Sequence, residues 1–294
     1  MQLIVELNDL KALKDYQKLS NLAYILIGIK DLSLTPAATF DFDEIDTIVE
    51  ELNSFKKDVG IIVNAERLYT DQELLKAKNI IEKLKTKKIA YFTYSDFGFY
   101  QMMKDNFKYD LIYRAPTYLT NYYDINLQAE NNSYVVASSE ITKEELAEID
   151  KQVNNDYIID LFGRHACFYS KRKLLSMYFK YRNDSHNPYN DDYYIIEELR
   201  KEKQPIKEDE TGTHIFSTSN QYLLEEIKNL KKAKYGIIHT IFLNKKQTKA
   251  VIKSYDEYLK TFDTEVFYKK LEENNVAYYK GQYDKKSILL KKEA

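Results

Sequence analysis

The sequence YILIGI at residues 24–29, followed by DFDEIDTIVEELNSFKKD at 41–58 and VGIIVNA at 59–65, decides the fold of this chain. The two flanking runs are short, apolar and rich in β-branched residues, which is typical of buried strands. The segment between them repeats apolar residues at steps of three and four, as on the buried face of an amphipathic helix. These residues are Ile45, Ile48, Val49, Leu52 and Phe55. A strand, a helix and a second strand in this order predict a crossover between parallel strands.

The same alternation continues along the chain and gives eight candidate strands. They are LIVEL (3–7), YILIGI (24–29), VGIIVNA (59–65), IAYFTY (89–94), DLIYRA (110–115), YVVAS (134–138), YIIDLF (157–162) and GIIHTIF (236–242). Two helices open with capping boxes, Thr70 with Glu73 and Thr142 with Glu145. Eight strand–helix units closed on themselves predict an α/β fold of the TIM-like (β/α)8 barrel type. An open doubly wound sheet is the alternative, although no GxGxxG follows the first strand.

The remaining segments are predicted to be additions to a single barrel domain of residues 1–294. Residues 163–235 separate the last two candidate strands and are too long for one crossover, so they are predicted to be an insertion. Within it, YYIIEEL and QPIKEDETGTHIFSTS predict a small β-hairpin with a turn at Gly212, followed by a helix at 220–232. Residues 246–273 form a C-terminal helical segment that is expected to cover the barrel.

The composition is that of an ordinary folded protein. Hydrophobic residues make up 44% and charged residues 31% of the chain, which supplies enough apolar material for a full core. The formal net charge of −2 excludes a global basic field, so any nucleic-acid binding must be local. One cysteine cannot form an intramolecular disulfide, the N-terminus lacks signal-peptide features, and the apolar runs fall short of the ~18 residues of a membrane span. We therefore expect a cytoplasmic protein without a membrane segment.

Polar residues follow the candidate strands, where the loops of a barrel gather on one face and carry its site. They are Lys30, Asp31, Asn64, Glu66, Arg67, Ser95, Asp96, Arg114, Ser139, Glu140, Gly163, Arg164 and His165, with His239 inside the eighth run. Each alone can be polar simply because its strand leaves the core. Together, their three arginines and four carboxylates predict a site for an anionic small molecule or a phosphate, since guanidinium pairs bidentately with either.

The segment DLFGRHACFYSKRKLL at residues 160–175 contains the single cysteine, Cys167. A cysteine nucleophile needs a nearby base, but residues two apart such as His165 need not face it, so a buried structural thiol is the preferred interpretation. The histidines show no zinc spacing, and no GxSxG elbow is present. Basic residues in and after this segment suit either phosphate binding or a solvated surface. They are Lys171, Arg172, Lys173, Lys180 and Arg182.

Several segments, taken in order, resemble peptidase family U32, the collagenase-like proteins. They are YILIGIKDLSL, IIVNA with Asn64, YSDFG with Ser95, Asp96 and Gly98, YLTN with Asn121, VVASSEITKEEL with Ser139 and Glu140, DLFGRHACFYSKRKLL, and ETGTHIFSTSNQYLLEEI. The resemblance covers about residues 20–240 and implies a TIM-like barrel. Some members are called proteases, and others serve wobble-uridine 5-hydroxylation in tRNA with prephenate, or oxygen-independent ubiquinone synthesis. This short chain is most similar to the smaller partner of a two-protein tRNA hydroxylation system, which implies tRNA and a larger U32 protein as partners.

Three departures from the family pattern favour a helper or binding role. Cluster-bearing relatives place cysteines around the segment matching HACFYSKRK, and this chain has only Cys167 there, so it cannot hold an iron–sulfur cluster alone. The arginine expected after the second strand is missing from DLSLTPAATF. In the eighth strand, HTIFLN replaces the glutamate–glycine–arginine pattern of the family.

The leading hypothesis is a component of tRNA wobble-uridine 5-hydroxylation whose barrel mouth binds an anionic metabolite or the tRNA backbone. The predicted catalytic residues are Asp96, Glu140 and His165, which would orient groups or transfer protons. The predicted substrate-binding residues are Asn64, Arg67, Arg114, Asn121, Arg164, Lys171 and Arg172. No metal site is predicted. The alternatives are a peptidase of unassigned mechanism and a noncatalytic partner or scaffold.

Overall fold

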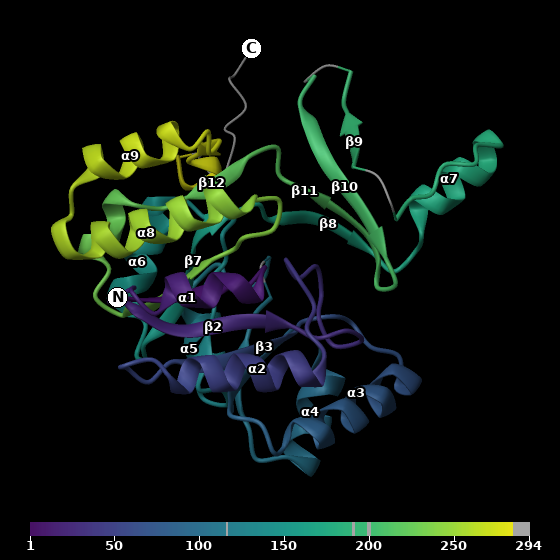
Figure 1. The fold of residues 1–294 in the computed structure, drawn as a ribbon, viewed down its shortest axis with the longest axis horizontal. Helices are drawn as coiled ribbons and strands as arrows, with labels where there is room; N and C mark the ends of the chain where they lie inside the picture. Colours follow the sequence, from purple (N-terminus) through teal and green to yellow (C-terminus); the bar gives the residue numbers. More distant parts are fainter. Residues whose placement is uncertain (116, 190–191, 199–200, 285–294) are drawn as a thin grey trace.

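The computed structural model describes residues 1–115, 117–189, 192–198 and 201–284. It shows an α/β fold around a ten-stranded sheet in the order β14-β12-β7-β13-β1-β2-β3-β4-β5-β6 (Figure 1). From β7 to β6 in this order, all neighbouring strands pair in parallel. These eight strands are β1 (Gln2–Glu6), β2 (Leu22–Gly28), β3 (Gly60–Ala65), β4 (Ile89–Tyr94), β5 (Asp110–Tyr113), β6 (Tyr134–Val135), β7 (Tyr157–Gly163) and β13 (Ala233–Ile238). Each of the eight predicted runs overlaps one of them.

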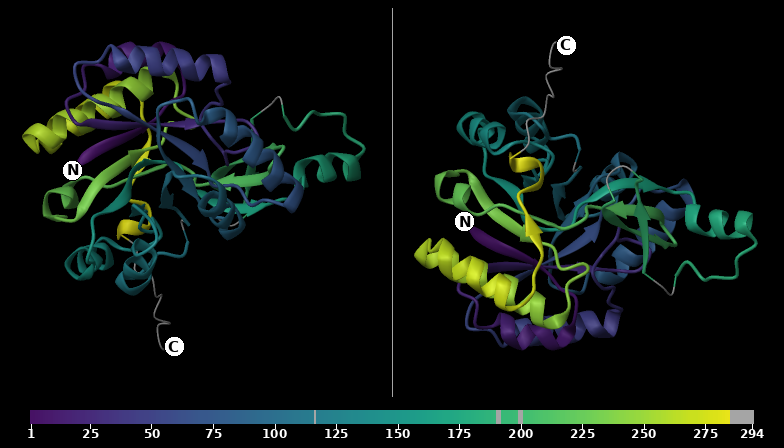
Figure 2. Two further views of the ribbon diagram at one scale, coloured as in Figure 1. Left: turned by 90° about the horizontal axis from the view of Figure 1, so that it is seen from below. Right: turned by 90° about the horizontal axis from the view of Figure 1, so that it is seen from above.

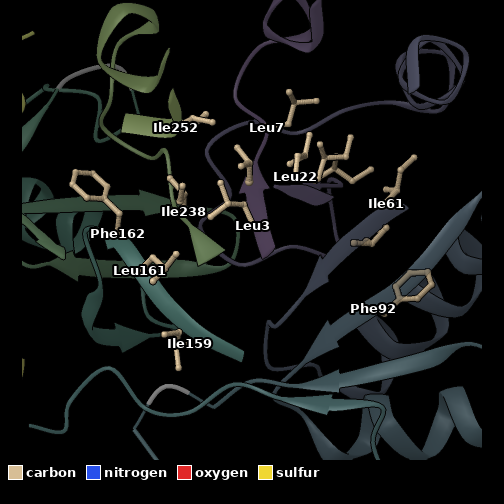
Figure 3. Close-up of a cluster of buried hydrophobic side chains, with 14 of the residues drawn as sticks. Leu3, Leu7, Leu22, Ile61, Phe92, Ile159, Leu161, Phe162, Ile238 and Ile252 are labelled. Carbon is tan, nitrogen blue, oxygen red and sulfur yellow. The ribbon is translucent and has the colours of Figure 1, made fainter. Parts of the chain in front are cut away.

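The parallel strands bury both of their faces. Along β1, Leu3 and Val5 belong to the larger core between the sheet and its helices, part of which Figure 3 shows. Ile4 belongs instead to a smaller core on the opposite face, because successive side chains of a strand point to opposite sides. That core also contains Leu26, Ile62, Ile112, Val136, Ile158, Tyr235 and Ile237. Burial on both faces explains why these strands appear in the sequence as nearly continuous apolar runs.

The sheet curves until its strands β6 and β7 approach each other. Val136, directly after β6, forms an isolated parallel bridge with Ile158 of β7. The backbone N–H of Ala137 donates to the Ile158 carbonyl at 2.9 Å. In the described residues this bridge, and not a continuous ladder, joins the two strands.

Helices follow most of the parallel strands and cover the larger core (Figures 1 and 2). They are the short α1 (Leu13–Tyr16), α2 (Phe42–Asn53), α3 (Asp71–Leu84), α4 (Phe97–Asn106), α5 (Tyr122–Ala129) and α6 (Lys143–Gln152). The capping boxes predicted at Thr70 and Thr142 are both present, with Glu73 and Glu145 completing them. The crossover helix predicted from the opening sequence is α2, which begins after Asp41.

Residues 166–216, here called the arm, form most of the insertion after β7. Their antiparallel sheet has the order β8-β11-β10-β9. Its strands are β8 (Ala166–Ser170), β9 (Tyr193–Ile196), β10 (Lys203–Asp209) and β11 (Gly212–Phe216), and α7 (Leu174–Arg182) follows β8. The predicted hairpin is β10 and β11, and the predicted turn at Gly212 has a φ of +136°. Of the predicted strand YYIIEEL, Leu199 lies outside the described residues.

The helix predicted at residues 220–232 is wrong. The segment forms β12 (Asn220–Tyr222) and a 3-10 helix, η2 (Glu225–Asn229). β12 pairs antiparallel with β7, with Gln221 opposite Gly163, and parallel with β14 (Tyr278–Tyr279). The free edge of β7 therefore decides this segment's conformation, a tertiary effect that overrides the local pattern.

The C-terminal helical segment predicted at 246–273 is two helices. α8 (Lys245–Thr261) ends at Phe262, which adopts a left-handed conformation with a φ of 54°. Asp263 then caps α9 (Thr264–Glu273) by accepting a hydrogen bond from the Val266 N–H. Cap geometry therefore interrupts a continuous apolar pattern, and a last 3-10 helix, η3 (Gly281–Asp284), follows β14. In the described part of the chain, no helix is long and apolar enough to span a membrane.

Candidate functional site

A pocket opens at the carboxyl ends of the parallel strands. Its volume is about 90 Å³, room for about three water molecules at ~30 Å³ each. Its polar lining consists of Glu6, Thr35, Asn64, Glu66, Ser95, Arg114, Ser139, Glu140, Arg164, His165 and His239. These side chains lie at or after the ends of all eight parallel strands, and the arm adds Ala166 and Phe216. The pocket is therefore where the sequence predicted a site.

A larger cavity, of about 490 Å³, lies at the amino-terminal ends of the strands. Tyr24, Tyr91 and Tyr235 line it, and their rings and that of Tyr134 make edge-to-face contacts with centroids 5.2–5.9 Å apart. Burial raises the pKa of the three lining tyrosines, so their hydroxyls stay neutral. Buried ionised groups, which are typical of functional sites, lie instead at the carboxyl ends of the strands.

Arg114 is the centre of the charge network in the strand-end pocket. It follows β5, and its Nη1 donates to Glu66 Oε2 at 2.6 Å while its Nη2 donates to Asp160 Oδ2 at 3.1 Å. Nη2 also lies 3.2 Å from His239 Nε2. Burial alone would lower the pKa of Arg114, but the Asp160 and Glu66 carboxylates raise it. One guanidinium therefore balances two buried carboxylates.

Asp160 connects this ion pair to two histidines. Its Oδ1 lies 2.9 Å from His239 Nε2, and its Oδ2 lies 3.8 Å from His165 Nδ1. Burial would raise the pKa of Asp160, but Arg114 and His239 hold it well below its usual range. Asp160 is therefore ionised and fixes the orientation of the His239 ring.

His165 is neutral at pH 7. Burial lowers its pKa to about 4, and the repulsion of His239 and Arg114 reinforces burial against the attraction of Asp160. A neutral imidazole donates a hydrogen bond through one nitrogen and accepts one through the other. Because a base with a pKa this low takes up protons poorly at pH 7, His165 is better suited to orient a ligand than to remove its proton.

Arg164 and Glu140 bring opposite charges to the pocket. Arg164 Nη1 donates to the Ser217 carbonyl at 3.0 Å, and its guanidinium carbon lies 5.4 Å from the centre of the Phe242 ring. Its buried Nε has no hydrogen-bond partner among the described residues. The Glu140 side chain is exposed at the pocket. These two groups are the charges in the lining that remain accessible to a ligand.

Asn64 and Glu6 line the pocket but are engaged in holding its loops. Asn64 Oδ1 accepts from the Leu34 N–H at 3.0 Å, and its Nδ2 donates to the Leu34 carbonyl at 3.1 Å. Glu6 accepts from the N–H of Ala37 at 2.9 Å and from the N–H of Thr240 at 2.8 Å. Both side chains therefore fix the shape of the pocket wall.

Asp96 and Asn121 lie outside the pocket lining. Asp96 is the N-cap of α4, where its Oδ1 accepts from the Phe99 N–H at 2.9 Å. Asn121 is the N-cap of α5 and accepts from the Asp124 N–H at 3.0 Å. Asp and Asn are favoured at this position because their side chains satisfy free amides. These contacts give both residues a structural role.

Arg67 and Lys171 meet at Glu73, also outside the pocket lining. Glu73 Oε1 accepts from Arg67 Nη2 at 2.5 Å, and its Oε2 accepts from Lys171 Nζ at 2.9 Å. Burial would raise the pKa of Glu73, but hydrogen bonds from Lys171 and Thr70 lower it to about 2. Arg67 and Lys171 therefore secure α3 and the base of the arm. Arg172 is exposed on the arm.

Of the three arginines from which an anion site was predicted, one remains available to a ligand in the pocket. Arg67 is not among the residues that line the pocket, and Arg114 is balanced by Glu66 and Asp160. An anionic ligand would therefore depend on Arg164.

Asp160 and Glu6 are the residues that sequence reasoning missed. They lie inside the runs YIIDLF and LIVEL and not after them, so a search of the strand ends passed over them. The signal was nevertheless present, because an acid inside an apolar parallel strand is buried and must find partners.

Cys167 lies outside this charge network and outside the pocket lining. It is exposed on β8, and its Sγ donates to the Ile215 carbonyl at 3.4 Å. Burial of the sulfur raises its pKa, which disfavours the nucleophilic thiolate. The expected burial of the whole residue is wrong, since β8 is an edge strand of the arm. One cysteine does not fit a cluster that needs four thiolates, and the described residues contain no group of three or more side chains suited to a metal ion.

The chain is a parallel α/β protein with a polar pocket at the carboxyl ends of its strands, the edge at which proteins of this class carry their ligand sites. The sequence model of peptidase family U32 matches residues 10–287. The chain therefore belongs to peptidase family U32, as its motifs predicted.

Two known proteins are similar to this chain. The tRNA hydroxylation protein P2 of Bacillus subtilis (strain 168) is 28% identical over 116 residues, a match that covers 38% of this chain and 38% of that protein. The solved structure of the U32 peptidase Mk0906 is similar with a TM-score of 0.50 at 8% identity, covering 81% of this chain and 92% of that chain. At this identity the structural similarity supports the fold alone.

Proposed function

We propose that this chain is a cytoplasmic component of tRNA wobble-uridine 5-hydroxylation that acts with a larger U32 protein. The observation that carries the proposal is the similarity, within one family, to tRNA hydroxylation protein P2. The pocket supports a role in binding and orientation, since it offers the neutral His165 and the partly available Arg164.

We also infer that the eight parallel strands act as a TIM-like barrel closed at the bridge between Val136 and Ile158. The smaller core supports this inference, because it collects side chains from strands on both sides of the bridge. Closure would make the pocket the mouth at the carboxyl ends of the strands, where TIM-barrel enzymes carry their sites.

The pocket as described is small for a metabolite. Sites for drug-sized ligands have volumes of about 300–1,000 Å³, whereas this pocket has about 90 Å³. For this reason we propose prephenate as a co-substrate of the two-protein system as a whole and not as a ligand of this pocket as it stands. Its binding here would require displacement of the arm residues Ala166 and Phe216, which line the pocket.

The test is the nucleoside content of tRNA from a strain that lacks this gene. Total tRNA is digested, and 5-hydroxyuridine derivatives are quantified by mass spectrometry after complementation with the wild type, Arg164→Ala or Cys167→Ser. We expect loss of these nucleosides in the deletion strain, recovery with the wild type and with Cys167→Ser, and failure with Arg164→Ala.

Unchanged nucleosides in the deletion strain, with redundant genes also removed, would contradict the proposed function. Full recovery with Arg164→Ala and with Asp160→Asn would instead indicate a scaffold whose pocket is not used. Immunoblots of each variant are needed to show equal protein levels.

Peptidase activity is a second candidate, favoured by the family to which the chain belongs. Glu140 and His165 would then have to polarise a water molecule in the pocket. Sustained cleavage of collagen-derived peptides that is abolished by Glu140→Gln would support it, and absence of cleavage would remove it.

A further inference from the structure

The arm carries a helix with little contact to the rest of the protein. α7 buries Leu175 and Phe179, which pack with Ile206 of β10 in a small separate core. Figures 1 and 2 show α7 at the outer end of the arm, away from the parallel sheet. The rest of the surface of α7 faces solvent. Because the narrow apolar stripe of Leu175 and Phe179 attaches the helix to the arm, this exposed surface is free to contact a ligand.

The charges of α7 and of the three residues before it are all of one sign. Residues 171–182 contain five basic residues and no acidic residue. Lys171 is engaged by Glu73, and Lys173 donates to the Tyr189 hydroxyl at 2.8 Å. In the part of the chain that is described, Arg172 and Lys180 form no ion pair, and the carboxylate near Arg182 is Asp184, which His186 also contacts. Arg172, Lys180 and Arg182 are therefore available to an anionic partner.

Exposed aromatic rings lie between these cations. Tyr181 is 83% exposed, the highest value among the exposed large apolar side chains of the described residues, and Tyr178 is 56% exposed. Tyr178 and Arg182 are four residues apart, so they are neighbours on the helix surface. Aromatic rings beside unpaired cations are the arrangement with which proteins bind single-stranded nucleic acid, since bases stack on the rings and phosphates pair with the cations.

The distance between α7 and the strand-end pocket sets a minimum length for a ligand that would contact both. Ala166, the first residue of β8, lines the strand-end pocket, and α7 follows the other end of that strand. Five residues of extended strand span about 17 Å. A ligand that contacts both α7 and the pocket must therefore be a polymer and not a small metabolite.

We propose that the exposed surface of α7 and the segment just before it, formed by Arg172, Tyr178, Lys180, Tyr181 and Arg182, binds the anticodon arm of tRNA. This inference rests on the proposed function and adds the surface that would recognise the RNA. The cations hold phosphates, the two tyrosines stack on unpaired bases, and the arm extends from this contact to the pocket.

The test measures RNA binding by the purified full-length chain. Fluorescence anisotropy follows a labelled anticodon stem-loop with a wobble uridine, at several salt concentrations. The affinity falls as salt is added, so a plot of log K against log salt has a negative slope. The variant R172Q/K180Q/R182Q is expected to make this slope less steep by about two, since each phosphate contact of a single strand contributes ~0.7. The variant Y178A/Y181A is expected to bind at least ~30-fold more weakly with an unchanged slope, because two base-stacking contacts are lost.

Two matched variants serve as controls. K11Q/K14Q/K18Q removes three exposed charges near the N-terminus, and Tyr123→Ala removes a ring that is 71% exposed on α5. Both are expected to bind like the wild type. Thermal melts of all variants show whether the fold is retained.

The outcomes separate the two proposals. Wild-type binding that the α7 variants leave unchanged overturns this inference and leaves the proposed function standing. Absence of wild-type binding also overturns it, and the nucleoside analysis of the deletion strain then decides the proposed function independently. Loss of a copurifying protein in the α7 variants, with RNA binding intact, would assign the surface to a protein partner and overturn the inference.

Discussion

Replacement of Arg114 by methionine tests whether the pocket network is an electrostatic unit. The substitution keeps much of the volume but leaves Glu66 and Asp160, which Arg114 contacts at 2.6 and 3.1 Å, without their shared cation. An unpaired buried carboxylate avoids its charge by binding a proton. From the ordinary Asp pKa of 3.8 to pH 7, this costs about 4 kcal/mol at ~1.4 kcal/mol per pH unit. The value agrees with the ~3–5 kcal/mol expected for removing one partner of a buried pair.

The pH dependence of this loss gives the prediction its sign. In the wild type the pKa of Asp160 is below its ordinary value, so its contribution to stability is complete above about pH 4 and constant between pH 5.5 and 7. In Arg114→Met the folded state binds a proton that the unfolded state does not, so the stability of the variant rises as the pH falls. The deficit should therefore shrink from about 4 kcal/mol at pH 7 to about 2 kcal/mol at pH 5.5.

Urea denaturation of both proteins at the two pH values measures the deficit. Arg172→Met, at an exposed position, serves as the control and should change the free energy of unfolding by less than ~0.5 kcal/mol. A deficit below about 1 kcal/mol at pH 7, or an equal deficit at both pH values, would refute the reasoning.

Three further predictions concern single residues. Cys167→Ser should leave tRNA hydroxylation unchanged in the complementation assay, because the exposed thiol lies outside the pocket and its pKa is raised; loss of activity would revive a nucleophilic role. The pKa of His165 is about 4 in the folded protein against an ordinary 6.5, so its contribution to stability is complete above pH 6.5, and the fold loses about 2 kcal/mol of stability on acidification to pH 5. NMR titration should find the His165 ring neutral at pH 5.5. A titration midpoint near 6.5 would contradict the burial argument. Gly212→Ala should destabilise the arm by more than ~1 kcal/mol, since its φ is +136° and a Cβ would lie 2.0 Å from the Ser170 carbonyl oxygen; faster proteolysis between β10 and β11 would show it, and an unchanged cleavage rate would argue against strain at this turn.

The sequence predicted the parallel strands well because burial on both faces leaves a strong local signal. Ile4 and its neighbours Leu3 and Val5 are apolar because they belong to two different cores, and such a run is typical of a strand that is buried on both faces. The capping boxes at Thr70 and Thr142 were equally local, since their contacts span three residues. The segment 220–232 failed because its partner is β7, far away in the sequence.

The sequence predicted where the pocket lies but only some of the residues that line it. Strand-end logic located Arg114, Glu140, Arg164 and His165 in one pocket. It also selected Asp96, because a carboxylate after a strand looks alike whether it caps the next helix or serves chemistry.

Glu73 has a consequence for how relatives of this chain diverge. One carboxylate completes the first turn of α3, neutralises Arg67 and holds Lys171 at the base of the arm. A neutral residue at this position would leave the buried Arg67 with Asp31, 4.0 Å away, as its remaining carboxylate, and Lys171 with the Leu68 carbonyl as its remaining contact at the base of the arm. Substitutions at positions 67, 73 and 171 should therefore accumulate in concert, so that the inclination of the arm is inherited together with the start of α3.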